Sequence, residues 1–518
     1  MEDFMIFFGG AYAVKGEIDH AGNPPITKYR KWSSKEDVSM VAYVPIPYAD
    51  LNDVSDNQFV MTPDNEKFDL LSIDTKLMQL AEIFLLYTTL NNSTSRPDIV
   101  IWDQSMSGVM ASNDEPPEMI NMVGNEIMGQ KITYQDAVIA FSHPYQDDLK
   151  IPSVRSVEVY DSILKELMKG KKVNIADFAK ENNLEKQIVF NKIKKYLLTQ
   201  HSDTDPIAIR EGDVLTVEPK WRNSWYNSVT MFQNFCNRLF NKKDSSVLIY
   251  KRYSDDGTYD EHWISPTDLK YLISIGLRAV VELAWENQVM LVGIVKDSAS
   301  THLSQKYLGT MRFVKAPGYQ FDDVLLPWSD RLFLQALPEK NLEFKAPWST
   351  IEFDSVFMTL HVQRNIVNNE PEITGVQGNI LNKERLFFRS LAQFYLKRSG
   401  KKFNMGHVIF VDRLILPHVE SNLNHIDVKS KELGTVKPFF FQNNSAENDV
   451  QEVMMYILKI LTRNLFPEVI GYPDPLHKAD WGAKSMNKKV ANMIKSSGKF
   501  LKIRPLAKTL RQERGSRR

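Results

Sequence analysis

Three short apolar runs in the sequence each end in an acid. IVIWD ends at Asp103, MLVGIVKD at Asp297 and VIFVD at Asp412. In open α/β sheets ligands bind at the carboxyl ends of strands, so an acid at that point is well placed to hold a metal ion. For any single Asp of this kind, a helix-cap or turn role is the more common one.

A fourth acid lies inside an apolar helical pattern. Residues 76–90, KLMQLAEIFLLYTTL, have amphipathic helical periodicity, and Glu82 sits among their apolar side chains. A buried carboxylate is costly without a partner or a metal, which makes Glu82 a candidate ligand. The alternative is a rim residue that faces water.

The elements that must position these acids are short strands and long helices. Residues 449–465 repeat the amphipathic helical pattern of residues 76–90. Four apolar segments rich in β-branched or aromatic residues have the character of strands buried on both faces of a mixed or parallel sheet. These segments are 5–14, 98–102, 288–295 and 407–411. Together the patterns predict an α/β fold.

Residues 163–198 have a different pattern, that of three helices with a helix–turn–helix shape. The pattern resembles a winged-helix unit, whose second helix would carry several lysines. It predicts either a DNA-reading element or a protein-interaction insert, and lysines on one helix are usually only its wet face. The lysines are Lys186, Lys192, Lys194 and Lys195.

Charge is distributed unevenly along the 518 residues, although the formal net charge is zero. Residues 484–518 contain twelve Lys or Arg and one acid, Glu513, which leaves a net charge of minus eleven on the first 483 residues. Such a basic tail adds salt-sensitive affinity for nucleic acid. The alternative is a solvated terminal helix with frayed ends.

Several classes of protein are disfavoured by what the sequence lacks. Cys236 is the only cysteine, so a disulfide framework and a thiolate zinc cluster are excluded. There is no secretory signal or long apolar span, and we expect a cytoplasmic protein with no membrane partner. Neither a phosphate-binding Gly-rich loop with Lys nor a Gly-x-Ser-x-Gly elbow is present, which argues against an ATPase, a kinase and a serine hydrolase.

The order of motifs along the chain resembles that of the NurA nuclease family. The helix with Glu82 precedes RPDIVIWDQSMSG, and VGIVKDSASTHL, PWSDRLFLQAL and IGYPDPLHKADWGAKS follow in turn. The resemblance implies a ribonuclease-H-like mixed sheet core flanked by helices, and a toroidal homodimer. It also implies Mn²⁺-dependent (or Mg²⁺-dependent) cleavage of single- and double-stranded DNA, with docking onto a hexameric HerA-type ATPase in DNA end processing or antiviral defence.

The resemblance also implies roles for individual residues. Glu82 and Asp103 resemble the family's metal-binding carboxylates, and Asp480 stands where the C-terminal motif usually has His. A carboxylate suits Mn²⁺ or Mg²⁺ as well as an imidazole does, so we expect these three acids to be the metal ligands. Tyr472 resembles the motif tyrosine, and Lys296 a lysine that contacts phosphate. His477 is a candidate for orienting water or protonating a leaving group, although a structural role is more common for such a His.

One departure from the family pattern concerns the first strand. FFGGAYAV has Gly9 where the family has its first metal-binding Asp. Candidate replacements are Glu17, Asp19 and Asp297. Without a replacement the site would hold metal weakly, and the alternative function is a catalytically weakened DNA-binding or adaptor subunit of the ATPase complex.

We expect the chain to have four parts. Residues 1–150 and 216–483 are the two portions of the core, residues 151–215 are a helical insertion, and residues 484–518 are the basic tail.

A third function class, a transcription-type DNA binder, would be built around residues 163–198. A sequence-specific reader and a nuclease differ in which part of the chain contacts DNA.

Overall fold

The computed structural model describes most of the chain. The described residues are 4–29, 39–47, 59–61, 67–142, 159–182, 184–200, 204–254, 256–296, 300–319, 329–334, 347–358, 360–367, 370–377, 386–397, 403–420, 424–430, 434–436, 438–440, 448–462 and 471–500.

The largest sheet is mixed, in agreement with the α/β prediction. Its strand order is β22-β25-β17-β20-β21-β15-β7, with β16 paired to β20. Only β7 and β15 are parallel, and β15–β21 and β20–β21 are antiparallel. The strands are β7 (Ile99–Trp102), β15 (Met290–Lys296), β16 (Trp348–Ser349), β17 (Phe353–Asp354), β20 (Phe387–Lys397), β21 (Phe403–Leu414), β22 (Asn424–His425) and β25 (Phe439–Phe440).

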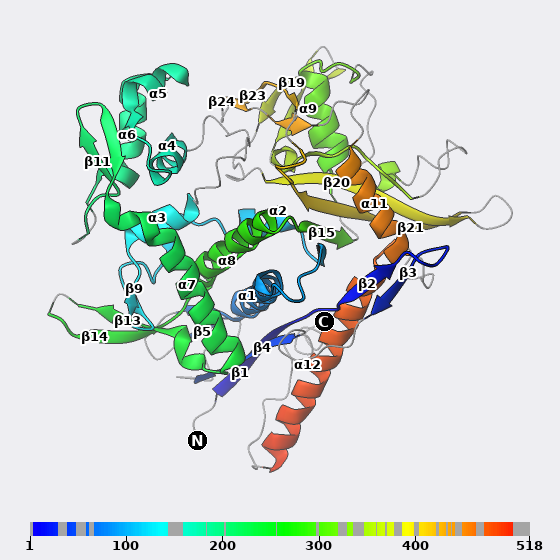
Figure 1. Cartoon of the computed structure of the whole chain (residues 1–518), viewed down its shortest axis with the longest axis horizontal. Helices are drawn as coiled ribbons and strands as arrows, with labels where there is room; N and C mark the ends of the chain where they lie inside the picture. Colours follow the sequence, from blue (N-terminus) through cyan, green and yellow to red (C-terminus); the bar gives the residue numbers. More distant parts are fainter. Residues whose placement is uncertain are drawn as a thin grey trace.

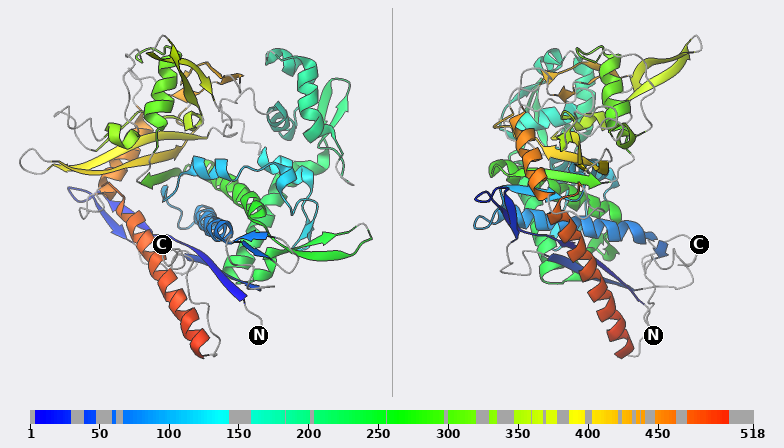
Figure 2. Two further views of the ribbon diagram at one scale, coloured as in Figure 1. Left: turned by 180° about the vertical axis from the view of Figure 1, so that it is seen from behind. Right: turned by 90° about the vertical axis from the view of Figure 1, so that its right-hand side faces the viewer.

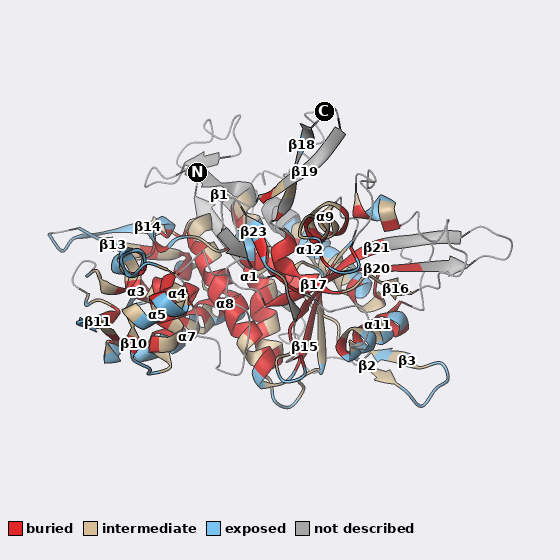
Figure 3. Cartoon of the chain, turned by 90° about the horizontal axis from the view of Figure 1, so that it is seen from above, coloured by how far each residue is buried: buried red, intermediate tan, exposed pale blue. Residues whose placement is uncertain are grey.

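Helices cover the two faces of this sheet with separate sets of apolar residues. On one face, α11 (Asp449–Leu461) and the start of α12 (Asp474–Phe500) pack on Met290, Val292 and Ile294 of β15. On the other face lie α1 (Leu70–Asn91), α7 (Ser224–Cys236) and α8 (Pro266–Glu286), which together form the densest buried region (Figures 1 and 3). Alternate residues of each strand therefore face different helices.

The helices predicted from periodicity are present. The segment 76–90 lies within α1, and 449–461 of the predicted segment 449–465 form α11, while residues 463–465 lie outside the described part. Helix α8 begins at a capping box, in which Ser265 and Asp268 bond each other's backbone amides. A Cβ at Gly276 of α8 would lie 2.5 Å from the Phe232 ring of α7, so the lack of a side chain allows this close approach.

The first predicted strand exists, but its sheet assignment is wrong. Strand β1 (Phe4–Tyr12) pairs along its whole length with β4 (Ser39–Pro47) in a separate antiparallel pair that packs on α1. The two strands are near neighbours in sequence, so joining them costs little loop entropy. Composition identifies a strand but does not reveal which partner it selects.

Residues 159–217 form a small unit beside the main body (Figure 1). The strand order of its sheet is β10-β12-β11. Along the chain, one helix and one strand are followed by two helices and then by two strands. The elements are α4 (Val159–Met168), β10 (Val173–Asn174), α5 (Ile175–Glu181), α6 (Lys186–Ile193), η3 (Lys194–Leu198), β11 (Ala208–Glu211) and β12 (Val214–Val217). The three predicted helices of this segment are therefore present.

The last described helix, α12, extends away from the sheet over 27 residues (Figure 2). Its first turns pack on α11 and β1, where Gly482 lies so close to the Tyr12 ring that a Cβ would be 2.4 Å from it. Residues 484–500 of the basic tail belong to this helix. Among the described residues, no helix is long and apolar enough to cross a membrane.

Candidate functional site

The parallel strands β7 and β15 bring two of the predicted site residues to one edge of the sheet. Trp102 at the end of β7 is opposite Gly293 of β15, so Asp103 and Lys296 both follow at that edge. Ile101 packs with the apolar residues on the α11 face. By strand alternation Asp103 and Lys296 point to the same side, toward α12.

Tyr472 lies between these two residues and helix α12. The Lys296 ammonium is 4.4 Å from the centroid of the Tyr472 ring, a cation–π distance. The Tyr472 side chain is buried, and its hydroxyl interacts with the Asp103 carboxylate, although no hydrogen bond of normal geometry joins the two groups. Burial raises the pKa of Tyr472, and the nearby Asp103 carboxylate raises it further, so this hydroxyl stays protonated at ordinary pH.

Asp480 completes this group from the second turn of α12. Burial raises the pKa of Asp103, and the Asp480 charge raises it too, whereas Tyr472 and Lys296 act in the opposite direction. Asp480 is itself paired with Lys484 one turn later, at 2.6 Å. The structure thus brings together Asp103, Lys296, Tyr472 and Asp480, with Lys484 as an unpredicted fifth member.

Glu82 approaches the same strand end from the opposite side. It accepts hydrogen bonds from Trp102 Nε1 at 3.0 Å and from Gln104 Nε2 at 2.5 Å. Burial raises the pKa of Glu82 to about 7, and the Asp103 charge adds to that effect. Trp102 and Gln104 face α1 while Asp103 faces α12, so Glu82 and Asp103 interact electrostatically across the end of the strand.

This alternation has a direct consequence for metal binding. Within the described residues, no three His, Cys, Asp or Glu side chains converge as a preassembled metal-ligand group. Glu82 is held by Trp102 and Gln104, and Asp480 is held by Lys484. The other two predicted ligands, Glu82 and Asp480, are neighbours of Asp103, but each is already held by a local partner.

The other candidate residues that the structure describes, Glu17, Asp19 and His477, are fully or partly exposed. Gly9 pairs with Ala42 in β1 and brings no carboxylate. Asp19 on β2 (Gly16–Asp19) forms a 2.5 Å ion pair with Lys28 on β3 (Ile26–Tyr29), and Glu17 is exposed on the same hairpin. His477 is exposed on α12. Asp297 lies outside the described residues.

Asp412 has a role that the sequence did not reveal. It was expected at a strand end, but β21 continues to Leu414, so Asp412 lies inside the strand and on the α1 side of the sheet. Arg389 on β20 donates to its carboxylate from Nε at 2.7 Å and from Nη2 at 2.9 Å, and Ser107 donates from its hydroxyl at 2.7 Å. Burial opposes its ionisation, but Arg389 and the serines outweigh that effect and lower its pKa.

This buried cluster fixes the turn that carries Asp103. Ser105 caps α2 (Met106–Ser112) and also donates to Asp412, and Arg389 Nη2 donates to the Ser105 hydroxyl at 2.7 Å. Arg389 Nη1 lies 2.8 Å from His302 Nδ1. The sequence offered one signal for this cluster, the Ser-x-Ser pair just after the strand, but the partner Arg389 is distant in the chain.

Ion pairs neutralise the charges of two of the four lysines that were predicted on a DNA-reading helix. Lys186 forms a 2.6 Å ion pair with Asp213, and Lys195 forms a 2.6 Å ion pair with Glu118. Lys192 and Lys194 are exposed. A helix that reads DNA needs cations directed at phosphates, so these pairs weaken the transcription-factor hypothesis.

No protein-family model, curated protein or solved structure matches this chain. Any functional assignment therefore depends on the residues around Asp103.

Proposed function

We propose that this chain is a NurA-like, metal-dependent deoxyribonuclease that acts on single- and double-stranded DNA. One observation carries the proposal. Asp103, Lys296, Tyr472 and Asp480, which are widely separated in sequence, meet at the carboxyl ends of two parallel strands. In open α/β sheets that edge is where ligands bind. Carboxylates, a lysine and a protonated tyrosine are groups that suit phosphodiester chemistry.

The proposal includes a ribonuclease-H-like core made of residues 1–150 and 216–483, with residues 151–215 inserted between them. Pairing of β7 with β15 and packing of α1 on α8 support one body built from both portions. The remaining parts of the proposal follow from the motif resemblance. They are a homodimer in the cytoplasm and a HerA-type hexameric ATPase as partner, in DNA end processing or antiviral defence.

The three carboxylates Glu82, Asp103 and Asp480 are chemically suited to a hard divalent cation, although the structure does not hold them in a ready-made metal site. Asp103 is coupled electrostatically to both Glu82 and Asp480, and such mutual repulsion is relieved by a cation. Oxygen ligands suit Mn²⁺ and Mg²⁺. Binding would require Glu82 to leave Trp102 and Gln104, and Asp480 to leave Lys484. When bound, such an ion lowers the pKa of water and stabilises charge on a phosphoryl group.

The chain's own residues would position the DNA strand. Lys296 is exposed at the strand end and would contact a phosphate oxygen. The Tyr472 hydroxyl is buried beside the Asp103 carboxylate and stays protonated, so it would donate a hydrogen bond to a phosphate or a water that binds there. Asp103 would hold its place because Asp412 and Arg389 fix the turn after it.

A second candidate function is a non-cleaving adaptor subunit of a HerA-type complex. Two observations favour it, namely Gly9 in the first strand and the lack of three converging ligands among the described residues. In this candidate the Asp103 region and the basic tail would hold DNA without hydrolysing it.

The test is degradation of labelled linear DNA by the full chain with Mn²⁺. We expect Asp103→Asn to lower the rate at least about 100-fold, since it removes the central carboxylate of the site. Asp98→Asn is the matched control, because Asp98 is an exposed acid at the other end of the same strand. Binding without cleavage by the wild type would favour the adaptor, and equal cleavage by wild type and Asp103→Asn would contradict the proposed site.

A further inference from the structure

The surface of the unit formed by residues 159–217 is close to neutral. Its sequence has ten Lys or Arg and nine Asp or Glu. The ion pairs of Lys186 with Asp213 and of Lys195 with Glu118 use two of the cations on α6 and η3. Affinity for the DNA backbone comes from unneutralised cations, so this surface is poorly suited to that role.

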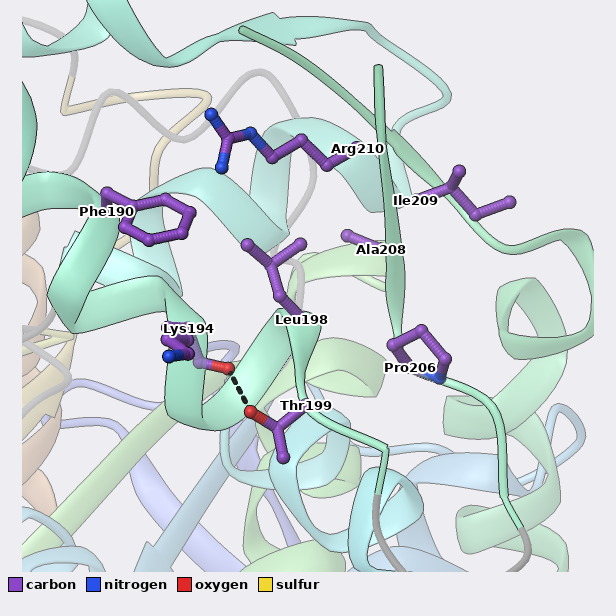
Figure 4. Close-up of a pocket in the computed structure, with 8 residues that line it drawn as sticks. All are labelled: Phe190, Lys194, Leu198, Thr199, Pro206, Ala208, Ile209 and Arg210. Carbon is purple, nitrogen blue, oxygen red and sulfur yellow. Dashed lines mark hydrogen bonds between the residues drawn. The ribbon is translucent and has the colours of Figure 1, made fainter. Parts of the chain in front are cut away.

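The same surface has a pocket between α6–η3 and β11, with a volume of about 400 Å³ (Figure 4). Its walls are apolar, and the titratable residues among its described lining are both cations. The apolar lining includes Phe190, Leu198, Pro206 and Ile209, and the cations are Lys194 and Arg210. A pocket of this size holds one or two side chains rather than a helix.

The two cations are held in different ways. The Arg210 guanidinium lies 4.5 Å from the centroid of the Phe190 ring and donates from Nε to the Gly212 carbonyl at 2.6 Å. These contacts fix its position, while its nearest carboxylate, on Asp213, is 3.9 Å away and is shared with Lys186. Lys194 is exposed. Its backbone amide donates to the Phe190 carbonyl and its carbonyl accepts from the Thr199 hydroxyl, and among the described residues no hydrogen bond or ion pair involves its ammonium group.

The apolar walls of the pocket are accessible. Phe190 and Leu198 are both half-buried, so each presents apolar surface to a ligand. We propose that this pocket binds a segment of a partner protein in which an apolar side chain is followed or preceded by Asp or Glu. The apolar side chain would enter between Phe190 and Leu198, which Figure 4 shows on the same side of β11 as Arg210, and the carboxylate would pair with Lys194 and Arg210. Apolar anchors with a charged rim are typical of such docking sites.

This proposal is independent of the nuclease assignment, because the pocket and the Asp103 site are on different elements. The test is selection of a random 12-residue peptide library, displayed on phage, against the full chain, with the Leu198→Asp chain as the counter-target. We expect peptides enriched on the wild type to have Leu, Ile, Met or Phe within three residues of Asp or Glu.

The best peptide is then measured by fluorescence polarisation. We expect Lys194→Glu to weaken its binding about tenfold, the effect of 1.4 kcal/mol, and to favour a version with Lys in place of the acids. Ile188→Asp is the matched control, since Ile188 is exposed on α6, directly before η3, but does not line the pocket. Lys194→Glu changes an exposed side chain and should keep the wild-type thermal midpoint, so it tests the pocket even where Leu198→Asp fails to fold.

Three outcomes would overturn the proposal. They are no enrichment on the wild type, enrichment of peptides that lack acids, and equal binding of the best peptide to wild type and Lys194→Glu. A 30-base-pair duplex is measured in parallel. Loss of duplex affinity in Lys194→Glu, with unchanged peptide binding, would assign this surface to DNA instead.

Discussion

Glu82 and Asp103 show how one residue step in a strand separates two carboxylates. Trp102 and Gln104 face α1 and bind Glu82, while Asp103 between them faces α12. Both acids have a raised pKa, for which burial is the first cause. Glu82, with a pKa of about 7, is partly protonated near neutral pH and would release its proton when a cation binds.

The first prediction concerns the pH dependence of stability. The pKa of Glu82 is about 7 in the folded chain and near 4.5 when unfolded, so the folded state holds the proton more tightly. This effect lowers the stability of the wild type as pH rises from about 4.5 to about 7. The Gln side chain of Glu82→Gln is neutral at every pH. The free energy of unfolding of this variant should therefore rise relative to that of the wild type between pH 4.5 and pH 7, by at most about 3 kcal/mol.

The measurement is urea unfolding of both proteins at intervals from pH 4.5 to 8.5. Parallel stability curves for wild type and Glu82→Gln would contradict the burial of this carboxylate.

At the scale of single residues, the sequence predicted part of the candidate site. Asp103, Lys296 and Tyr472 were recognised from motifs, and they do lie together. The role of Asp412 was not predicted, because it depends on its ion-pair partner. That partner, Arg389, lies directly opposite Asp412 on the adjacent strand β20 and is distant from it in the sequence. His477 was a plausible acid by type, but its position on α12 leaves it exposed.

At the scale of elements, close approach between backbones positions the site. A Cβ at Gly293 of β15 would lie 2.4 Å from the Gln104 carbonyl oxygen and 3.2 Å from the Met106 amide nitrogen. The turn after β7 therefore lies directly against β15, which keeps Asp103 beside Lys296. Gly482 has the corresponding role where α12 contacts β1.

The next prediction follows from that contact. Gly293→Ala must push the turn away from β15, because backbone atoms have nowhere to move without displacing α2. We expect a loss of about 1–3 kcal/mol in the free energy of unfolding, together with reduced DNA cleavage.

Gly375→Ala is the control, since Gly375 is also a strand glycine, in β19 (Glu370–Gln377), and a Cβ there would lie 3.7 Å from Gln363 Oε1, an ordinary contact distance. Equal effects of the two substitutions on stability and on cleavage would contradict the positional role of Gly293.

The sequence predicted elements better than their assembly. Apolar periodicity identified α1 and α11, and β-branched runs identified β7, β15 and β21. The sheet membership of β1 could not be inferred, because strand pairing depends on contacts between segments. The exact extent of β21 was also missed, since an acid in a strand interior looks like a strand end until its ion pair is known.

At the scale of the whole molecule, charge is separated along the chain. The tail from residue 484 is strongly basic and the preceding 483 residues carry a net charge of minus eleven. Residues 484–500 extend the α12 helix that brings Asp480 to the site. An acidic body with a basic extension would hold DNA mainly through that extension.

Removal of residues 501–518 tests this distribution. The segment has seven Lys or Arg and one acid, so its loss should weaken DNA binding and lower the slope of log affinity against log salt by up to about 6. Replacing the seven cations with Gln, which keeps the chain length, should have the same effect. An unchanged salt slope in both proteins would show that the tail does not contact phosphates.

The central claim is that carboxylates distant in sequence hold a divalent cation around Asp103. Electron paramagnetic resonance of free Mn²⁺ during titration with the full chain measures this directly. We predict that the wild type and Asp98→Asn reduce the free Mn²⁺ signal equally and that Asp103→Asn reduces it much less. Equal reduction by all three proteins, or no reduction by the wild type, would contradict the claim.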